Sequence, residues 1–333
     1  GLSEQTKGDS SMNILKTLLS KASPVLVAGA ISMMLFIAGP AAAAWKPDGT
    51  LTLQIGFGAG GSTDTLGRVL AKVMKEQTGW NIIVENKTGG GGIAMFTGIA
   101  KMPPRGKVIG LGVNMPVLVN LVRRPNELAF KLDIFDYLGT ISKAELALVA
   151  AADAPFDDLP GMIAYAKQQG TLAVAFGAPP QKLLIDVAAI ETDTNFNLVT
   201  TKGGAETMKL ILGGQVMVGF SSGEHFPHAE AGKMKIIAGA NAKRLSYAPG
   251  VGTFVDAGIN AYVDPWYYLA TTKGTDAVAL NAISKAISNA LKAPEMKEIA
   301  RNTIKNDPLN LGPSGTRKMM VDGVSNVRIL FGQ

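Results

Sequence analysis

Alternation of short apolar runs with helical segments constrains the fold of this chain more than any other feature. The first series has apolar runs LTLQIGF, NIIVEN and KVIGLGV, separated by helices predicted at about 63–78 and 93–101. The second has strands TLAVAF, FNLVT, QVMVGF and MKIIAGA, separated by helices predicted at KLLIDVAAIE, GAETMKLIL and PHAEAGK. Short strands that alternate with helices predict parallel strands in α/β sheets flanked by helices.

The two series predict two lobes that the chain connects twice. The extended stretch YLGTISKAELALVAA, residues 137–151, precedes the second series, and the strand WYYLATT follows it. The C-terminal helices predicted at 277–291, 294–304 and 314–330 can return to the first series. We therefore assign residues 45–147 and 265–333 to lobe 1 and residues 148–264 to lobe 2. Because ligands of open α/β sheets bind beyond the carboxyl ends of the strands, we expect a cleft between the lobes.

The N-terminal residues 1–44 are predicted to be an upstream extension followed by a signal peptide. Lys16 and Lys21 precede an uncharged apolar stretch, and AAA ends at Ala44, before Trp45. This pattern is typical of a secretory signal with cleavage near Ala44. The alternative is an uncleaved anchor, but the apolar stretch is short of the roughly 20 residues that span a bilayer. We therefore expect export to the periplasm.

Composition narrows the possible chemistry. The chain has no cysteine, which excludes disulfides and thiolate metal sites, and its formal net charge of +6 comes from scattered Lys and Arg. Nucleic-acid binding is therefore not indicated. The two histidines, His225 and His228, lie near Glu224 and Glu230, but their spacing matches no metal motif. We expect neither metal nor cofactor, no catalytic triad and hence no enzyme.

Three glycine-rich loops each lead from a predicted strand into a predicted helix. They are GFGAGGSTD (56–64), NKTGGGG (86–92) and TTKGGA (200–205). Glycines expose backbone N–H groups, and the start of a helix carries a partial positive charge, so such loops bind anions. Three loops of this kind in one chain favour an anion-binding protein.

The first loop also matches the G-x-G-x-x-G pattern of dinucleotide-binding enzymes. Gly56, Gly58 and Gly61 fit its glycines, and Glu85 follows on the next strand. This keeps a nucleotide-dependent oxidoreductase open as an alternative. Asp64, however, would place a negative charge beside a pyrophosphate in the first turn of the helix. The export signal also argues against this alternative.

An ordered set of motifs resembles one known family. The stretches FGAGGSTDTLGR (57–68), VENKTGGGG (84–92), KGGAETMKLILGGQVMVGF (202–220), HAEAGKMKIIA (228–238) and AKRLSYAPGVGTFVDAG (242–258) are similar to those of TctC or Bug receptors. These are the periplasmic solute-binding receptors of tripartite tricarboxylate transporters. The resemblance covers essentially all of residues 45–333. It implies a type II periplasmic-binding-protein fold, in which two lobes close like a Venus flytrap.

The resemblance also implies which residues contact the ligand. The first two loops would grip one carboxylate of an organic acid; the matching positions are Phe57, Ala59, Gly60, Gly61, Ser62, Asp64, Thr88, Gly89 and Gly90. Lobe 2 would contribute Gly177, Ala178, Thr201, Lys202 and Gly203. Two departures affect these contacts from lobe 2. The loop FGAPPQK has prolines, which lack an N–H donor, where the family has serines, and Thr201 replaces a frequent tyrosine.

The function implied is capture of a small carboxylate and its delivery to membrane permease subunits, by a receptor expected to be a monomer. Dicarboxylates, tricarboxylates, aromatic acids and amino acids all fit a loop that binds one carboxylate. A sensory receptor that binds the same ligand is a further alternative, because the sequence does not separate transport from signalling.

Overall fold

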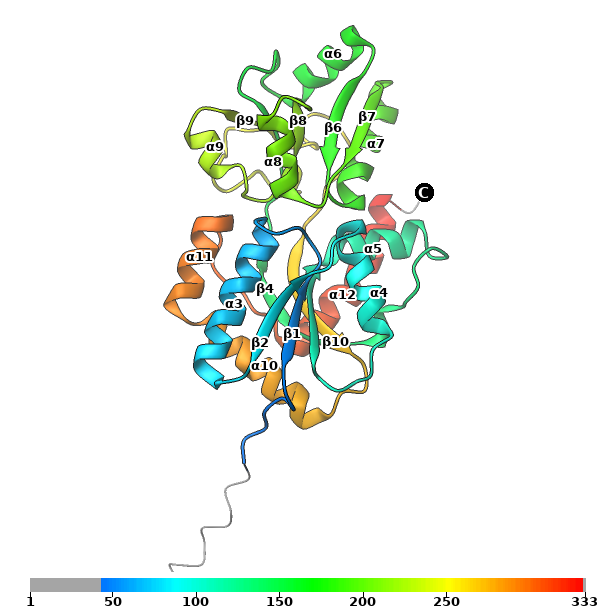
Figure 1. Ribbon diagram of the computed structural model, residues 1–333. Helices are drawn as coiled ribbons and strands as arrows, with labels where there is room; N and C mark the ends of the chain where they lie inside the picture. The colour runs from blue at the N-terminus through cyan, green and yellow to red at the C-terminus, as the bar shows by residue number, and fades with distance from the viewer. Residues whose placement is uncertain (1–42, 332–333) are drawn as a thin grey trace, which may run out of the picture. The chain divides into compact units, whose positions relative to one another are not determined.

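Two five-stranded sheets form the framework of the protein (Figure 1). The computed structural model describes residues 43–331, and the chain from Trp45 onward is one compact unit. The predicted extension and almost all of the predicted signal peptide lie outside the described residues. The first sheet contains β1 (Leu51–Ile55), β2 (Ile82–Asn86), β3 (Val108–Val113), β4 (Phe135–Lys143) and β10 (Trp266–Thr272). The second contains β5 (Ala147–Ala151), β6 (Leu172–Phe176), β7 (Phe196–Thr200), β8 (Val218–Ser221) and β9 (Met234–Gly239).

Both sheets are mixed rather than fully parallel. The strand orders are β2-β1-β3-β10-β4 and β7-β6-β8-β5-β9. The strands joined by short crossovers are parallel, as predicted: β1 with β2 and β3, and β6 with β7 and β8. However, β10 is antiparallel to β3 and β4, and β5 is antiparallel to β8 and β9. The predicted parallel strands of the two series are confirmed, and β5 and β10, which lie outside those series, run antiparallel because they enter their sheets from the other lobe.

Helices cover both faces of the first sheet (Figure 1). One hydrophobic cluster contains residues of α3 (Ser62–Thr78), α10 (Ala277–Leu291) and α11 (Pro294–Ile304). The other contains residues of α4 (Ile93–Ala100), α5 (Asn114–Arg123) and α12 (Gly312–Phe331). Tyr267 belongs to the first cluster and Tyr268 to the second, because successive side chains of a strand face opposite sides. Two short 3-10 helices, Gly90–Gly92 and Leu132–Ile134, complete this part.

The second sheet is covered in the same way. Residues of α6 (Leu159–Gln169) and α7 (Pro179–Thr192) share one hydrophobic cluster, and residues of α8 (Gly204–Leu212) belong to another. The short helix α9 (Phe226–Glu230) lies between β8 and β9 in the chain. The sequence analysis predicted α7, α8 and α9 to within a few residues. It did not predict α5 or α6.

The start of α3 is set by local sequence. Gly61 is extended (φ −77°, ψ 176°) and precedes the first helical residue, Ser62. Asp64 lies in the first turn, where a negative charge stabilises the helix. Gly67 allows close contact with the first sheet, because a Cβ at this position would lie 2.8 Å from Ile55 and Leu111 side-chain carbons. The helix that follows β1 is therefore packed directly against the first sheet near its N-terminus.

Two crossing segments connect the sheets, between Lys143 and Ala147 and between Gly239 and Trp266. Asn241 joins them: its Oδ1 accepts the Leu146 N–H at 2.8 Å, and its Nδ2 donates to Ala144 O at 3.0 Å. The Ala144 N–H also donates to Pro265 O at 2.8 Å. The chain therefore passes between the two sheets twice, and the two crossing segments are hydrogen-bonded to each other. The lobe boundaries at 147/148 and 264/265 stay a prediction.

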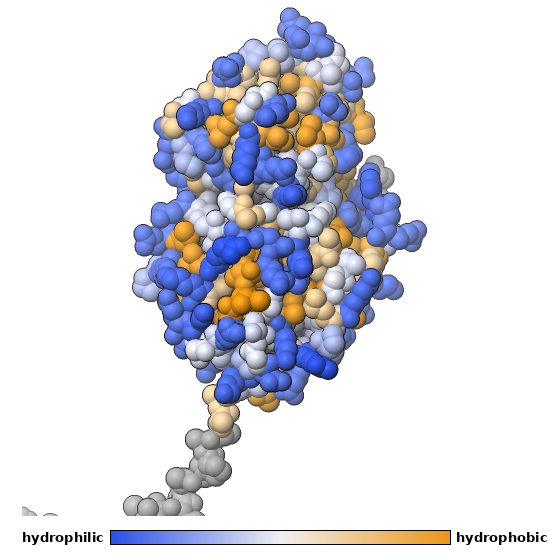
Figure 2. Space-filling model, viewed as in Figure 1, coloured by the Kyte–Doolittle hydropathy of each residue, from blue (hydrophilic) through white to orange (hydrophobic). Residues whose placement is uncertain are grey.

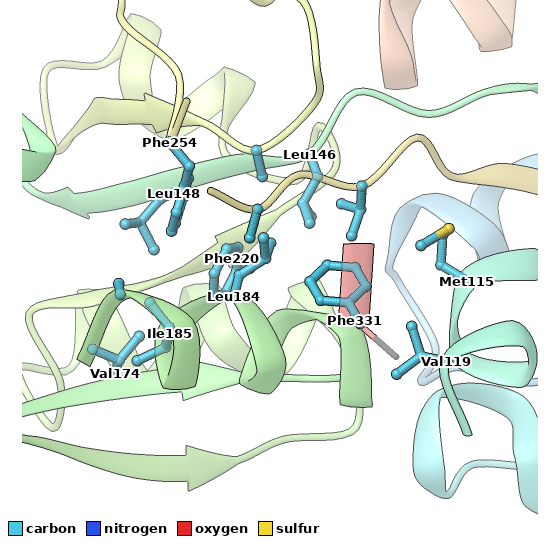
Figure 3. Close-up of a cluster of buried hydrophobic side chains, with 14 of the residues drawn as sticks. Met115, Val119, Leu146, Leu148, Val174, Leu184, Ile185, Phe220, Phe254 and Phe331 are labelled. Atoms are coloured by element: carbon cyan, nitrogen blue, oxygen red, sulfur yellow. The ribbon is translucent and has the colours of Figure 1, made fainter. Parts of the chain in front are cut away.

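One hydrophobic cluster runs without interruption from the first sheet to the second (Figure 3). Phe331, at the end of α12, lies between Met115 and Val119 of α5 and the side chains of Leu184 and Phe220. Apolar burial therefore supports the connection between the two sheets in addition to the crossing segments.

A matched pair of isoleucines tests the assignment of the core. Ile99 on α4 is fully buried, whereas Ile190 on α7 is 81% exposed. We expect Ile99→Ala to lower the free energy of unfolding by about 2–5 kcal/mol, because it leaves a cavity against β3. We expect Ile190→Ala to change it by less than about 0.5 kcal/mol. Urea unfolding of both variants measures the difference, and similar losses would contradict the packing described here.

Candidate ligand-binding site

A cavity of about 380 Å³ lies where the loops of the two sheets meet. It is lined from the first sheet by the loop after β1, the start of α5 and Tyr267. From the second sheet it is lined by the loops that follow β6, β7 and β8. Carboxyl ends of strands from both sheets therefore converge on it, which is where ligands of open α/β sheets bind. On the face shown in Figure 2, a central band of residues of intermediate hydropathy crosses the molecule, between regions of hydrophilic and hydrophobic residues.

The cavity brings together part of the predicted residue set. Predicted residues that line it are Phe57, Ala59, Gly61, Ser62, Ala178, Lys202 and Gly203. The predicted residues that do not line it are Gly60, Asp64, Thr88, Gly89, Gly90, Gly177 and Thr201, and no residue of the second glycine loop (86–92) belongs to the lining. The role of all these residues in binding stays a prediction.

Asp64 organises the first loop from within. Its buried carboxylate accepts the Gly60 N–H, the Arg68 Nε–H and an Asn86 Nδ2–H, each at 2.9 Å. Burial raises the pKa of Asp64, but the hydrogen bonds from Gly60, Asn86 and Arg68 outweigh it and hold this pKa below its ordinary value. Asp64 is thus an ionised brace for the loop, and its oxygens face protein donors.

Asn86, at the end of β2, completes this brace and was not predicted from the sequence. Its Nδ2 donates to both Phe57 O and Asp64 Oδ1 at 2.9 Å. Its Oδ1 accepts from Arg68 at 2.8 Å. The only signal for it in the sequence is its place at the start of the second glycine loop.

The second glycine loop is built for close packing. Gly89, Gly90, Gly91 and Gly92 all have positive φ, between 61° and 133°. A Cβ on Gly91 would lie 2.8 Å from the Cβ of Ala178, and a Cβ on Gly56 would lie 2.7 Å from the Gly92 Cα. This loop therefore supports the first loop from behind and also contacts the second-sheet side of the cavity.

In the predicted loops of the second sheet, several hydrogen-bond donors and acceptors are paired with groups of the same loops and the helices that follow them. The Gly177 N–H donates to Gln181 Oε1 at 2.7 Å, and the buried Thr201 hydroxyl bonds to Thr207 Oγ1 at 2.9 Å. Lys202 O, in contrast, accepts the Gly58 N–H at 3.0 Å. This backbone hydrogen bond joins the first loop to the loop after β7.

Glu224 is the most informative residue that the sequence analysis did not assign to the ligand site. It follows β8 and lines the cavity from the second sheet. Its Oε1 accepts the Ser62 N–H at the start of α3 at 2.8 Å. Its Oε2 accepts from Ser222 N at 2.8 Å and Ser221 Oγ at 3.1 Å. A carboxylate therefore already contacts the N-terminus of α3, within the loop predicted to bind one.

Tyr267 adds a hydroxyl donor beside this point. It is 1% exposed and donates to Ser62 Oγ at 3.0 Å. Burial raises the pKa of the Tyr267 hydroxyl, so it stays protonated and can act as a donor. Tyr267 therefore belongs both to the buried strand β10 and to the wall of the cavity.

Much of the remaining wall is apolar. It includes side chains from the start of α5, from both crossing segments and from the second sheet: Val113, Met115, Pro116, Leu146, Pro180, Phe220, Val263 and Pro265. Lys202, Lys209, Gln181 and Glu206 are polar exceptions. A few polar groups in a mainly apolar cavity are typical of a small-molecule site.

Within residues 43–331, no group of three or more His, Asp or Glu side chains is arranged to hold a metal ion. His225 instead bonds through Nδ1 to Ser221 Oγ at 2.8 Å. In the same part of the chain, no helix combines the length and apolar character needed to cross a bilayer.

Comparison with known proteins identifies the family. Residues 66–330 match the profile of the tripartite tricarboxylate transporter family receptor, TctC. The chain belongs to the TctC family. The UPF0065 protein in the gbd 5' region of Cupriavidus necator is 30% identical over 260 residues, covering 76% of this chain and 77% of that protein. Protein BugT of Bordetella pertussis is 27% identical over 297 residues, covering 86% and 90%.

Solved structures share the fold of this TctC receptor. The periplasmic binding protein BugD superposes with a TM-score of 0.77 at 22% identity, covering 86% of this chain and 97% of that one. MatC of Rhodopseudomonas palustris, with bound malate, gives 0.76 at 22% identity and covers 85% and 99%. Rpa4515 of R. palustris, with adipate, gives 0.74 at 21% identity and covers 85% and 97%. The predicted two-lobed binding-protein fold and the predicted family are therefore confirmed, and the oxidoreductase alternative is not favoured.

His225 makes the stability of this region dependent on pH. Burial lowers the pKa of His225 to about 4 from 6.5, assisted by the nearby positive groups of His228 and Lys305 and opposed by Glu224. Between these values the unfolded chain binds a proton that the folded chain does not. The contribution of His225 to the free energy of unfolding is therefore fully present above pH 6.5. It is lost as the pH falls towards 4, by roughly 3 kcal/mol in total.

Urea unfolding at about pH 7.5 and about pH 4.5 measures this loss. We expect His225→Gln to have a smaller loss between the two pH values than the wild type. His228→Gln, which changes the other histidine, should keep most of the loss. Equal pH dependence of the wild type and His225→Gln would contradict the assignment.

Proposed function

We propose that the protein captures a small organic carboxylate in the cavity between its two sheets and delivers it to membrane permease subunits. The observation that carries this proposal is the Ser62 N–H, which donates to a carboxylate oxygen of Glu224 at 2.8 Å. The start of α3 therefore has the geometry to bind a carboxylate. The first four N–H groups of a helix have no acceptor within it, so this end can serve a ligand as well.

The family and its solved members support a carboxylate ligand. The family is named for tricarboxylate transport, and two solved structures of the same fold carry malate and adipate. The cavity volume, about 380 Å³, lies within the range of about 300–1,000 Å³ that is common for small-molecule sites. A di- or tricarboxylate, an aromatic acid or an amino acid is therefore the proposed ligand class.

We assign roles to the predicted residues on this basis. The backbone of Ala59, Gly61 and Ser62 contacts the ligand carboxylate, while Gly60 and Asp64 hold the loop in shape. Thr88, Gly89 and Gly90 support that loop from the second glycine loop. On the side of the second sheet, Ala178, Lys202 and Gly203 face the ligand from the cavity wall, and Gly177 and Thr201 position these loops.

The proposed mechanism is binding without catalysis, followed by recognition of the liganded form by the permease. The family consists of receptors, and BugD, a solved structure of the same fold, is a periplasmic binding protein. We propose the same location for this chain, reached through the signal peptide predicted to be cleaved near Ala44, and a monomeric state. A sensory receptor that binds the same ligand shares this site and differs only in its membrane partner.

A thermal-shift screen tests the ligand class. The purified protein is heated with malate, adipate, citrate, benzoate and glutamate, and with NADH as the control for the oxidoreductase alternative. A ligand at 100 times its Kd stabilises the fold by about 2.7 kcal/mol, which we expect to raise the Tm by a few degrees. A shift with one class of acid supports the proposal. A shift with NADH alone contradicts it.

A change at Ser62 tests the proposed anchor. Proline is tolerated at the first position of a helix, and the extended Gly61 suits a residue before proline, so Ser62→Pro removes the N–H while α3 is kept. We expect it to weaken the binding of the acid found in the screen by about ten- to a hundredfold, because a hydrogen bond to a charged group is lost. Ser62→Ala keeps the N–H and is the control for the lost hydroxyl. Equal affinities of Ser62→Pro and Ser62→Ala in calorimetry would contradict the role of this amide.

A further inference from the structure

Glu224 occupies the same donor that the proposed ligand needs. Its carboxylate accepts the Ser62 N–H at the start of α3, although the two residues are 162 positions apart and belong to different sheets. Two further donors to Glu224, Ser222 N and Ser221 Oγ, come from its own loop. One of its three hydrogen bonds therefore crosses to the first sheet, and the other two hold it in the second.

The Glu224 carboxylate is packed closely against the starts of α3 and α8. A Cβ on Gly204 would lie 2.3 Å from Glu224 Cδ, and a Cβ on Gly61 would lie 3.4 Å from Glu224 Oε1. Glycines at both helix starts thus make room for the Glu224 carboxylate, which already occupies the Ser62 N–H. A ligand carboxylate can reach the Ser62 N–H only if Glu224 moves away. Two carboxylates held close together also repel each other, more strongly in a partly enclosed site than in water.

The position of Glu224 allows it to move. The residue is only half-buried, and it lines the cavity rather than the core. Leaving the Ser62 N–H costs one hydrogen bond between the sheets, which the ligand carboxylate then replaces. The backbone hydrogen bond from Gly58 N to Lys202 O does not depend on Glu224 and can hold the two loops in contact during the exchange.

We propose that Glu224 is a built-in competitor of the ligand: it occupies the Ser62 amide in the ligand-free protein and is displaced when a carboxylate binds. This inference rests on the proposed function, because it assumes that the Ser62 amide serves the ligand. It makes Glu224 a determinant of affinity. Glu224 excludes carboxylates that bind the cavity weakly, since only an acid with enough additional contacts to the cavity displaces it.

Two variants and one control test the competition. Glu224→Ala removes the competing carboxylate, and Glu224→Gln keeps its size and an acceptor oxygen but removes the charge. Glu230→Ala is the control, because this substitution removes the same charge at the exposed end of α9, outside the cavity. Calorimetric titration with adipate, malate and benzoate gives the affinity of each protein. We expect Glu224→Ala to bind at least one of these acids about tenfold more tightly than the wild type, since the acid no longer displaces a charged acceptor.

Glu224→Gln should fall between the wild type and Glu224→Ala, and Glu230→Ala should equal the wild type. Unchanged or weaker binding of these acids to Glu224→Ala would overturn the inference, because it would make Glu224 a support of the site or a direct ligand contact. In that case the proposed function stands, since the acids still bind the wild type.

Amide hydrogen exchange without ligand gives a second readout. We expect exchange at the Ser62 amide to be about tenfold faster in Glu224→Ala than in the wild type, because the amide loses its acceptor. Equal exchange in both proteins would overturn the inference. If Ser62 responds in this way but none of the acids binds any of the four proteins, the proposed function fails and the competition fails with it.

Discussion

The N–H groups at the start of α3 need acceptors, and the arrangement of the whole cavity follows from how they find them. A helix provides no internal partner for these groups. Within the loop that precedes α3, Asp64 takes the Gly60 N–H and fixes the turn. From the other sheet, Glu224 takes the Ser62 N–H. The local carboxylate, Asp64, thus holds the shape of the loop, and the distant one, Glu224, connects the start of α3 to the loop after β8.

The local half of this arrangement could be predicted from the sequence. The strand at 51–55, the glycine turn and the helix that begins near Ser62 follow from residue preferences within a few positions of one another. The anion-binding character of the turn follows from the same residues. The break in the strand–helix alternation after the first series also predicted that the chain passes from one group of strands to another. The family resemblance added the type II periplasmic-binding-protein fold.

The rest depends on contacts between distant residues, which local patterns do not contain. The antiparallel direction of β10 is set by its insertion between β3 and β4, and its apolar sequence would suit either direction. Asn114 at the start of α5 is a residue type favoured at N-caps, but the N-cap is Val113, and the Asn114 Oδ1 instead accepts the Trp266 N–H of the distant strand β10. Glu224 reaches the cavity through a loop that the sequence analysis considered only as a candidate metal-binding segment. Asn86 was passed over because its role depends on the shape of the first loop.

The placement of β10 has a consequence for how the chain is assembled. All strands of the second sheet lie in one continuous stretch, Ala147–Gly239, whereas the first sheet needs both the beginning of the chain and the segment Trp266–Thr272. Because the chain is synthesised from the N-terminus onward, all strands of the second sheet are present before the first sheet has its last strand, β10. Until β10 is in place, β3 and β4 lack the strand between them, and the backbone N–H and C=O groups of their facing edges stay unpaired. The first sheet is thus the slower of the two to complete, since its closing contacts span more than 120 residues, from Gly139 to Leu269, and contacts so far apart in sequence are slow to form.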